Sequence, residues 1–403
     1  LMEIAVVGAG IIGLTVAHRL AGEGHRVTLI APADEPHRAS TGNAGTIAGY
    51  AVDPVGTPEV LRDLPRLLFN RDSPLAIHRP SALRLTPWLW RFARQSGPRS
   101  AEANRHVLAR ILGDADSRWR GLAFSLGAGT LLNEAGALYA YDTVEDMNAA
   151  EAGMERRRAH GVTVERLDAS QLLALEPRLP PGRFGGGMLF PGTLWLSDPA
   201  AMLARIEAGL QVARIGARAT GLSRHGAGWR VTHEEGALEA EAVVLAAGAW
   251  SARLLKPLGL RVPLTAERGY HLEFDRVEKV SRPLCPTRRG FYFTPMAGRL
   301  RAAGTVELGG IGAPPSPHRW ARLEEGVRSV FPDLPPPSRR WMGLRPSVPD
   351  SLPVVGPARK GLVCAFGHGH LGLTLAPWTA ERVSAALAGG PGDEAVSPLR
   401  FNR

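Results

Sequence analysis

The sequence contains very few cysteines, which excludes several classes of protein. Cys285 and Cys364 are the only two among 403 residues, and they lie far apart. A disulfide framework or a cysteine-rich metal site needs more cysteines at closer spacing. A reducing cytoplasm is therefore the expected setting.

Long hydrophobic runs are also missing. The longest early apolar run, residues 4–17, is too short to span a bilayer and is interrupted by Gly8, Gly10 and Gly13. Met2-Glu3 supplies no basic leading segment and no small-residue cleavage site follows, so the run does not resemble a signal peptide. We expect no membrane-spanning helix.

The sequence has fewer acidic than basic residues. The chain has 48 Lys and Arg against 38 Asp and Glu, a formal net charge of +10. Such an excess can indicate a nucleic acid or an anionic membrane as partner. The arginines are scattered, however, with short clusters at Arg156-Arg157-Arg158, Arg288-Arg289 and Arg339-Arg340. No long basic tract or aromatic-interleaved basic region is present, so we expect a solvated surface and no nucleic acid. Loose attraction to an acidic partner, or to the inner face of an acidic membrane, is the alternative.

Residues 3–30 contain the clearest motif. Residues 3–7 have the pattern of a buried strand, and Gly8-Ala9-Gly10-Ile11-Ile12-Gly13 follows directly. An apolar helix face and a second strand at 26–30 come next. The first glycine permits a tight turn, the second lets the backbone approach a pyrophosphate, and the third allows close helix–strand packing. This order predicts dinucleotide binding.

One expected element of a dinucleotide site is missing. An acidic side chain usually follows the second strand and holds the ribose hydroxyls. This chain has Ala31-Pro32-Ala33 there, with Asp34 and Glu35 only afterwards. Either one of these acids reaches back, or water and backbone make the contact.

Three further segments favour FAD over NAD. Residues 38–45 form a small, hydroxyl-rich loop that suits phosphate and isoalloxazine edges. Residues 242–251 and 362–374 each predict a buried strand that runs into a turn of small residues. Separated strand-to-turn segments imply one nucleotide domain assembled from distant stretches of chain.

These motifs together resemble the family of FAD-dependent D-amino-acid oxidases and dehydrogenases, and most closely its bacterial D-amino-acid dehydrogenase branch. Ser40-Thr41-Gly42-Asn43-Ala44-Gly45 with Gly49-Tyr50-Ala51 is similar to the branch's flavin loop. Gly343-Leu344-Arg345-Pro346, with Pro349-Asp350 and Pro353-Val354-Val355-Gly356, is similar to its arginine motif. Gly367-His368-Gly369-His370-Leu371-Gly372 is similar to its flavin-contacting turn. The similarity extends in patches from residue 4 to about residue 390.

The resemblance implies an α/β protein with an interrupted Rossmann-like FAD-binding domain and an α+β substrate domain that contains a mixed or antiparallel sheet. The FAD-binding domain is expected from residues 1–50, 197–258 and 341–390. The substrate domain is expected from residues 51–196 and 259–340. A polar helical run around 143–160 and strands near 269–274 and 290–294 agree with this division. Residues 391–403 predict a loosely ordered tail.

The resemblance also implies noncovalent FAD held by the glycine turn and the later motifs. The expected contacts are Gly8, Gly10, Ile11, Ile12, Gly13, Ser40, Thr41, Asn43, Ala44, Gly45, Ala247, Gly248, Gly367, His368, Gly369, His370, Leu371 and Gly372. For His368 and His370 the backbone amides are expected to matter more than the rings, because helix-start N–H groups stabilise negative charge on reduced flavin. No carboxylate or cysteine lies at ligand spacing from them, and we expect no metal.

Oxidation of an amino acid at Cα transfers a hydride to flavin N5, so the protein must anchor the carboxylate and align the Cα–H bond. Anchoring favours a planar bidentate donor, which arginine provides and lysine does not. The resemblance assigns the carboxylate to Arg345, assisted by the hydroxyl of Tyr292, whereas a structural arginine between the domains is the alternative. Tyr50, beyond the flavin loop, and Tyr270 and His271, on a predicted strand, are further candidates.

The resulting hypothesis is oxidation of the C–N bond of a small amino acid, with a D-amino acid favoured, to an imine that water hydrolyses to a 2-oxo acid and ammonia. A secondary amine acid such as D-proline, sarcosine or iminodiacetate is an alternative substrate. A noncatalytic or RNA-associated flavoprotein is the alternative from another class. The electron acceptor, O2, a quinone or a protein, is left open.

Overall fold

The computed structural model describes residues 1–69 and 75–402. A six-stranded sheet has the order β10 (Ala213–Ile215), β2 (Arg26–Ile30), β1 (Glu3–Val7), β14 (Ala242–Leu245), β21 (Leu362–Phe366) and β20 (Val354–Arg359). Its first five strands run parallel, and β20 is antiparallel to β21. The neighbours β1 and β14 lie more than 200 residues apart in sequence, so the interrupted nucleotide-binding arrangement of the α/β class is confirmed.

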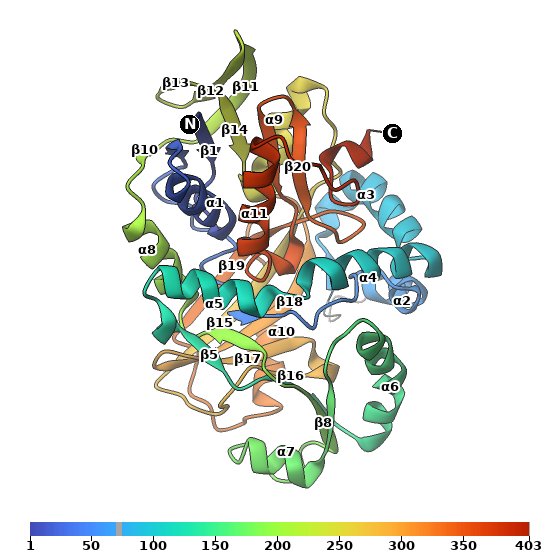
Figure 1. The fold of residues 1–403 in the computed structure, drawn as a ribbon. Helices are drawn as coiled ribbons and strands as arrows, with labels where there is room; N and C mark the ends of the chain where they lie inside the picture. The colour runs from blue at the N-terminus through green and yellow to red at the C-terminus, as the bar shows by residue number, and fades with distance from the viewer. Residues whose placement is uncertain (70–74, 403) are drawn as a thin grey trace.

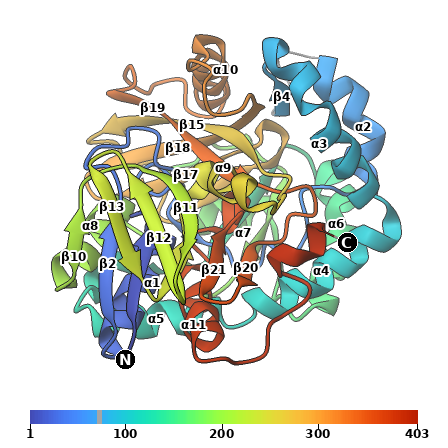
Figure 2. The same cartoon turned by 90° about the horizontal axis from the view of Figure 1, so that it is seen from above.

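Both faces of this sheet are covered, which explains why β1 has no polar alternation. Ile4 and Val6 pack in the core formed with α1 (Ile11–Gly22) and α11 (Ala376–Leu387). Ala5 and Val7 pack in a second core with Trp229 of a three-stranded antiparallel sheet, β11 (Ala219–His225), β12 (Gly228–His233) and β13 (Gly236–Ala240). Strands buried on both faces are continuously apolar. Figures 1 and 2 show the two layers on opposite sides of the parallel strands.

A larger, mixed sheet lies beside the first. Its order is β19 (Arg339–Ser347), β15 (Thr265–Asp275), β18 (Arg299–Leu308), β17 (Phe291–Met296), β16 (Leu284–Pro286), β6 (Ala137–Tyr141), β8 (Gly186–Phe190) and β7 (Glu165–Asp168), and β4 (Leu75–Ile77) pairs with β18. Phe291 and Phe293 share a core with Leu323 of α10 (Pro317–Arg328), which covers one face. The predicted strands at 269–274 and 290–294 fall within β15 and β17.

The remaining elements surround these sheets (Figure 1). They are α2 (Pro58–Phe69), α3 (Ala82–Gln95), α4 (Pro98–Leu112), α5 (Ala115–Ser125), α6 (Val144–Ala159), α7 (Ala169–Leu175), α8 (Pro199–Gly209), α9 (Ser251–Leu255) and a small sheet of β3 (Thr46–Ile47), β9 (Leu194–Leu196) and β5 (Leu132–Glu134). The predicted helical run is α6, and the Thr143 hydroxyl caps it by accepting from the Asp146 amide at 3.1 Å. In the described residues, no helix combines the length and apolar character needed to cross a bilayer.

Two expectations about the C-terminal part need revision. The sequence predicts residues 341–347 in the FAD-binding domain, but they belong to β19 and pair with β15 in the larger sheet. The domain division otherwise stays a prediction. The tail is packed rather than loose. Val396 is buried and its carbonyl accepts from the Val355 amide, while Arg400 pairs with Asp350 at 2.9 Å. The Gly and Pro content of the tail predicts loose order because composition does not record these two contacts with distant residues.

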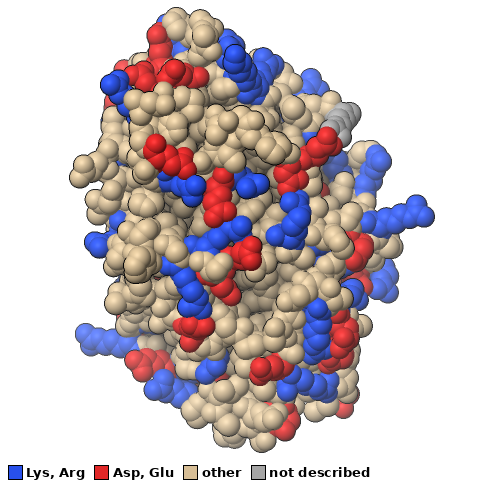
Figure 3. All heavy atoms as spheres, viewed as in Figure 1, with Lys and Arg blue, Asp and Glu red and all other residues tan. Residues whose placement is uncertain are grey.

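Many of the arginines form ion pairs with nearby acids, such as Arg214 with Glu207 and Arg230 with Glu239. On the face drawn in Figure 3, Lys and Arg side chains are interspersed with Asp and Glu. Two members of the arginine clusters are not solvated, however. The Arg157 side chain is 14% exposed and pairs with Asp53 at 2.8 Å, and Arg289 pairs with Asp142 at 2.8 Å. The expectation of a solvated cluster is wrong for these two residues.

Candidate active site

A cleft of about 380 Å³ lies at the carboxyl ends of the parallel strands. It is lined by residues that follow β1, β2, β14 and β21, and by β19. The expected cofactor residues that line it are Gly8, Gly10, Ile11, Ile12, Ser40, Asn43, Ala247, Gly248, His368, Gly369, His370 and Gly372. This edge of an open parallel sheet is where ligands of such folds bind. Gly13, Thr41, Ala44, Gly45, Gly367 and Leu371 are not among the lining residues.

The glycine turn forms a cradle that side chains would fill. Gly8 has φ +114°, and a Cβ there would overlap the Ala246 carbonyl. A Cβ at Gly13 would overlap the Gly8 carbonyl, so Gly13 sets the helix–strand packing without lining the cleft. Gly10, at the N-cap of α1, has no side chain to compete for the first-turn amides. The start of the helix lines the cleft and therefore fits the pyrophosphate of a dinucleotide.

The missing ribose acid has a candidate substitute. Ala31, Pro32 and Glu35 line the cleft, whereas Asp34 does not. The Glu35 carboxylate accepts from Arg218 at 2.8 Å, and Arg218 lies over the Trp250 ring. Of the alternatives considered from the sequence, Glu35 is the acid that the fold brings back to the cleft.

The flavin loop, residues 40–45, is held from inside and from the larger sheet. The Ser40 hydroxyl accepts from the Ile11 amide at 2.9 Å, which joins the loop to the glycine turn. The Asn43 side chain donates to the Ser40 carbonyl and accepts from the Gly45 amide, both at 2.7 Å.

Two side chains of the larger sheet also hold the flavin loop. His271 Nδ1 donates to the Gly42 carbonyl at 2.9 Å, and Arg301 donates to the Asn43 carbonyl at 2.6 Å. Because carbonyls only accept, Nδ1 of His271 carries the proton.

A buried ion cluster fixes Arg301 beneath the loop. Its guanidinium donates through Nε and Nη2 to Glu273 Oε1 at 2.9 and 2.6 Å, and Arg299 donates to the same oxygen at 3.0 Å. Burial alone would raise the pKa of Glu273, but Arg301 and Arg299 outweigh it and hold the pKa at about 2. Burial, reinforced by Arg301, lowers the pKa of His271 to about 3 and keeps its ring neutral. His271 thus supports the flavin loop.

Arg345 lines the cleft with a guanidinium that makes no hydrogen bond or ion pair to any described residue. It stands opposite Glu267 in the β15–β19 pairing, and its side chain crosses over Gly269. An ideal Cβ on Gly269 would lie 2.7 Å from Arg345 Cζ, so the glycine leaves room for the guanidinium. Burial lowers the pKa of Arg345, and Glu267 opposes that effect. A poorly solvated cation of this kind favours an anionic ligand.

Tyr292 lies on the same face of the larger sheet as Arg345. It pairs with Ala303, which pairs with His271 on β15, and paired residues project to one side. Successive residues of β15 project to opposite faces of the sheet. The face of Arg345 therefore carries positions 267, 269 and 271, and the side chain of Tyr270 is directed to the other side. There the Tyr270 hydroxyl donates to Glu307 at 2.8 Å and its ring packs on Trp320. The structure therefore places Tyr270 on the face opposite to Arg345 and Tyr292, contrary to the expectation that all three belong to one site.

Three tyrosine hydroxyls meet on this face. Tyr50 donates to Tyr292 at 3.5 Å, and Tyr292 donates to Tyr139 at 3.1 Å. Burial raises the pKa of both Tyr50 and Tyr292 well above the ordinary value, so the hydroxyls remain protonated donors. Tyr292 and Tyr139 nevertheless keep some accessible surface, whereas Tyr50 is buried against the Phe190 ring. None of the three lines the cleft itself.

The two histidines of the last turn are used differently. His368 is buried and bonds through Nε2 to the Thr379 hydroxyl at 2.9 Å, which ties the turn to α11. His370 lines the cleft with an exposed side chain. Its ring is therefore available to the cleft, beyond the backbone role expected for it. Cys364 packs in the core with Val243 and Leu362, and does not line the cleft.

Sequence reasoning missed several residues of this site. Glu273 and Arg301 carry no motif, because their partnership depends on the register of β15 with β18. Tyr139 had a weak signal in the alternating tyrosines of residues 137–141. Arg157 lies over the Tyr139 ring. Its sequence gave no signal, because it is one of three consecutive arginines on a polar helix.

Comparisons with known proteins agree with this geometry. Residues 3–386 match the family of FAD-dependent oxidoreductases. The chain is 33% identical to a D-amino-acid oxidase of Bradyrhizobium diazoefficiens, over 100% of this chain and 98% of that protein. It is 31% identical to a D-amino acid dehydrogenase of Cereibacter sphaeroides, over 96% and 92% of the two chains.

Solved structures show the same fold. The glycine oxidase of Geobacillus kaustophilus superposes with a TM-score of 0.77 at 25% identity, covering 99% of this chain and 98% of that one. An iminodiacetate oxidase of Chelativorans sp. BNC1 has a TM-score of 0.73 at 20% identity, with 98% and 99% covered. With the glycine cradle, the cleft and the family match in agreement, the chain belongs to the FAD-dependent oxidoreductases and uses FAD as its cofactor.

Proposed function

We propose that this protein oxidises the C–N bond of a D-amino acid to an imino acid, which water hydrolyses to a 2-oxo acid and ammonia. FAD, when bound, accepts the hydride from Cα. The observation that carries the proposal is the Arg345 guanidinium, which borders the cofactor cleft without a hydrogen-bonding partner among the described residues. The preference for D-amino acids is supported by the relatives, whose names specify D-amino acids.

Arg345 is assigned the substrate carboxylate. A guanidinium offers parallel N–H donors that match a carboxylate, and this pairing is stronger where water is scarce. The neutral hydroxyl of Tyr292, on the same sheet face, is assigned a supporting hydrogen bond. His370 shares the cleft with Arg345 and is assigned to the same end of the substrate. A fixed carboxylate limits the positions of Cα, which is the alignment that hydride transfer requires.

Four segments are assigned to the cofactor. They are the glycine turn, the flavin loop, the turn at Ala247-Gly248 and the turn at residues 367–372 that follows β21. Each contributes residues to the lining of the cleft. His271 and Arg301 hold two loop carbonyls, so they act on the cofactor indirectly by keeping the loop in place. We propose that FAD is noncovalently bound, since both cysteines are buried and neither lines the cleft.

The substrate class is tested by anaerobic reduction of the purified flavoprotein. We expect D-amino acids to bleach the visible absorbance of the oxidised flavin, which accepts the hydride, and L-enantiomers to leave the flavin oxidised. Faster bleaching by D-proline, sarcosine or iminodiacetate would instead support a secondary amine acid. Readmission of air or of a quinone analogue to the same cuvette then compares the electron acceptors. If no amino acid or amine bleaches the flavin, the proposal is wrong.

Gly269→Ala tests the placement of Arg345 without removing any charge. The new methyl group would lie within 3 Å of three guanidinium atoms and would displace the guanidinium from its present position. We expect KM for the amino acid to rise roughly tenfold, the effect of losing about 1.4 kcal/mol of binding, while FAD absorbance is retained. Gly221→Ala on β11 is the matched control, because a Cβ there makes only ordinary contact with Thr232. Equal KM values for both variants would contradict the assignment.

A further inference from the structure

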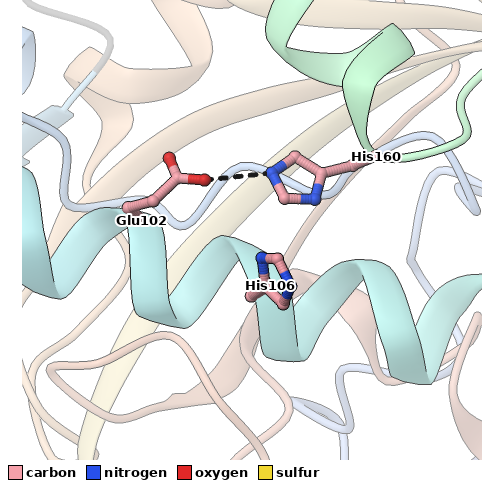
Figure 4. A group of neighbouring side chains, drawn as sticks. All are labelled: Glu102, His106 and His160. Carbon is pink, nitrogen blue, oxygen red and sulfur yellow. Dashed lines mark hydrogen bonds and ion pairs between the residues drawn. The ribbon is translucent and has the colours of Figure 1, made fainter.

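A group of three metal-ligating side chains lies outside the cleft. Glu102 and His106 come from α4, and His160 follows the last residue of α6. One ligand atom of each lies within 4.8 Å of those of the other two. Figure 4 shows Glu102 and His160 joined by a hydrogen bond with the His106 ring beside them. None of the three lines the cofactor cleft.

The positions of these residues suit a shared ligand. Glu102 and His106 are four residues apart, so they occupy the same face of the helix. His160 Nε2 lies 3.2 Å from Glu102 Oε1, and the two imidazole rings have centroids 5.2 Å apart in an edge-on arrangement. Ligand atoms at about 2.0–2.1 Å from a tetrahedral zinc ion are separated by roughly 3.3 Å. The Glu102–His160 pair already has that separation, and the third ligand atom, from the exposed side chain of His106, lies within 4.8 Å of both.

Arg105 holds the Glu102 carboxylate in this orientation. It donates to Glu102 Oε2, which leaves Oε1 directed at His160. Arg105 is itself buried and fixed by Asp53 through a 2.7 Å bond. Partners that orient a ligating carboxylate in this way strengthen metal sites.

The donor set selects among cations. Two imidazoles with one carboxylate suit zinc, whereas magnesium prefers oxygen ligands alone. The Glu102 side chain is 55% exposed, which leaves a fourth coordination position open to water. We propose that Glu102, His106 and His160 bind one Zn²⁺ ion, which joins α4 to the end of α6. His106 and His160 are 54 residues apart in sequence, so no local spacing motif marks the site.

Zinc binding is tested on the metal-stripped flavoprotein by competition with a chromophoric zinc chelator. We expect one high-affinity Zn²⁺ per chain, no displacement by Mg²⁺, and a rise in melting temperature on zinc addition. His106→Asn and His160→Asn should each weaken the site at least about tenfold, as loss of a ligand or its support does, and should remove the thermal shift.

His225→Asn is the matched control. His225 also pairs with a glutamate, at 3.1 Å from Glu239, but within the described residues no further ligand completes a group of three there. This variant should bind zinc like the unmodified chain. If either site variant fails to fold, as judged by loss of FAD, Glu102→Gln replaces it. A chain that binds no zinc, or site variants that bind it as tightly as the unmodified protein, would overturn the proposal. The readout does not depend on substrate oxidation.

Discussion

Arg345→Ala is expected to slow flavin reduction by amino acids about 100- to 1000-fold in kcat/KM while FAD remains bound. The reason is the loss of a bidentate, charge-assisted contact in a poorly solvated site, for which removal of one partner costs about 2–5 kcal/mol. Arg345→Lys should remain strongly impaired, because lysine keeps the charge but lacks the planar donor pair. Anaerobic stopped-flow reduction at several substrate concentrations measures the effect.

Arg218→Ala provides the contrasting control for Arg345. Arg218 also lines the cleft, but it pairs with Glu35 after β2 and lies over Trp250. Its loss should weaken FAD retention and leave reduction of the fully loaded protein close to normal. An Arg345→Ala variant that reduces its flavin at the unmodified rate would show that the residue is structural.

Glu273→Gln is expected to destabilise the protein by about 3–5 kcal/mol, the usual cost of breaking a buried ion pair by removing one partner. The Glu273 and Arg301 side chains are 3% and 4% exposed, so the arginine charge would be left uncompensated. Because Arg301 also donates to Asn43, we expect FAD to dissociate more readily as well. Thermal unfolding followed by tryptophan fluorescence and by FAD release measures both effects.

The same carboxylate predicts a pH dependence. Its folded-state pKa of about 2 lies below the ordinary value of 4.5, so its stabilisation is present above pH 4.5 and is lost as the pH falls toward 2. The shift corresponds to roughly 3 kcal/mol. Glu273→Gln should therefore flatten stability against pH in that window. Glu207→Gln, which breaks the exposed pair with Arg214, should change stability by less than about 1 kcal/mol. Equal losses in both variants would contradict a special role for Glu273.

Local sequence patterns were sufficient for the cofactor cradle. The strand at residues 3–7, the helix after Gly10 and the strand at 26–30 were all predicted, because their turn chemistry and apolar periodicity depend on neighbours within a few residues. The roles of Gly8 and Gly13 followed from the same local geometry. Family motifs then indicated Arg345 and Tyr292, although neither motif specified how the two side chains are placed.

Partnerships between distant segments could not be predicted. Tyr270 and His271 are adjacent in sequence, yet strand alternation directs one toward α10 and the other toward the flavin loop. Arg157 lies in a polar run but is buried because Asp53 approaches it from a distant loop. The tail is ordered because Arg400 meets Asp350.

The sequence alone determined the dinucleotide-binding turn, since glycine turns act through short-range sterics, and its later motifs indicated FAD through their resemblance to a flavoprotein family. Only the tertiary structure decided which acid reaches the cleft after β2, what holds the flavin loop, and which tyrosines share a face with Arg345. Those outcomes depend on strand register and on the pairing of charges that lie far apart along the chain, and a linear pattern does not record either.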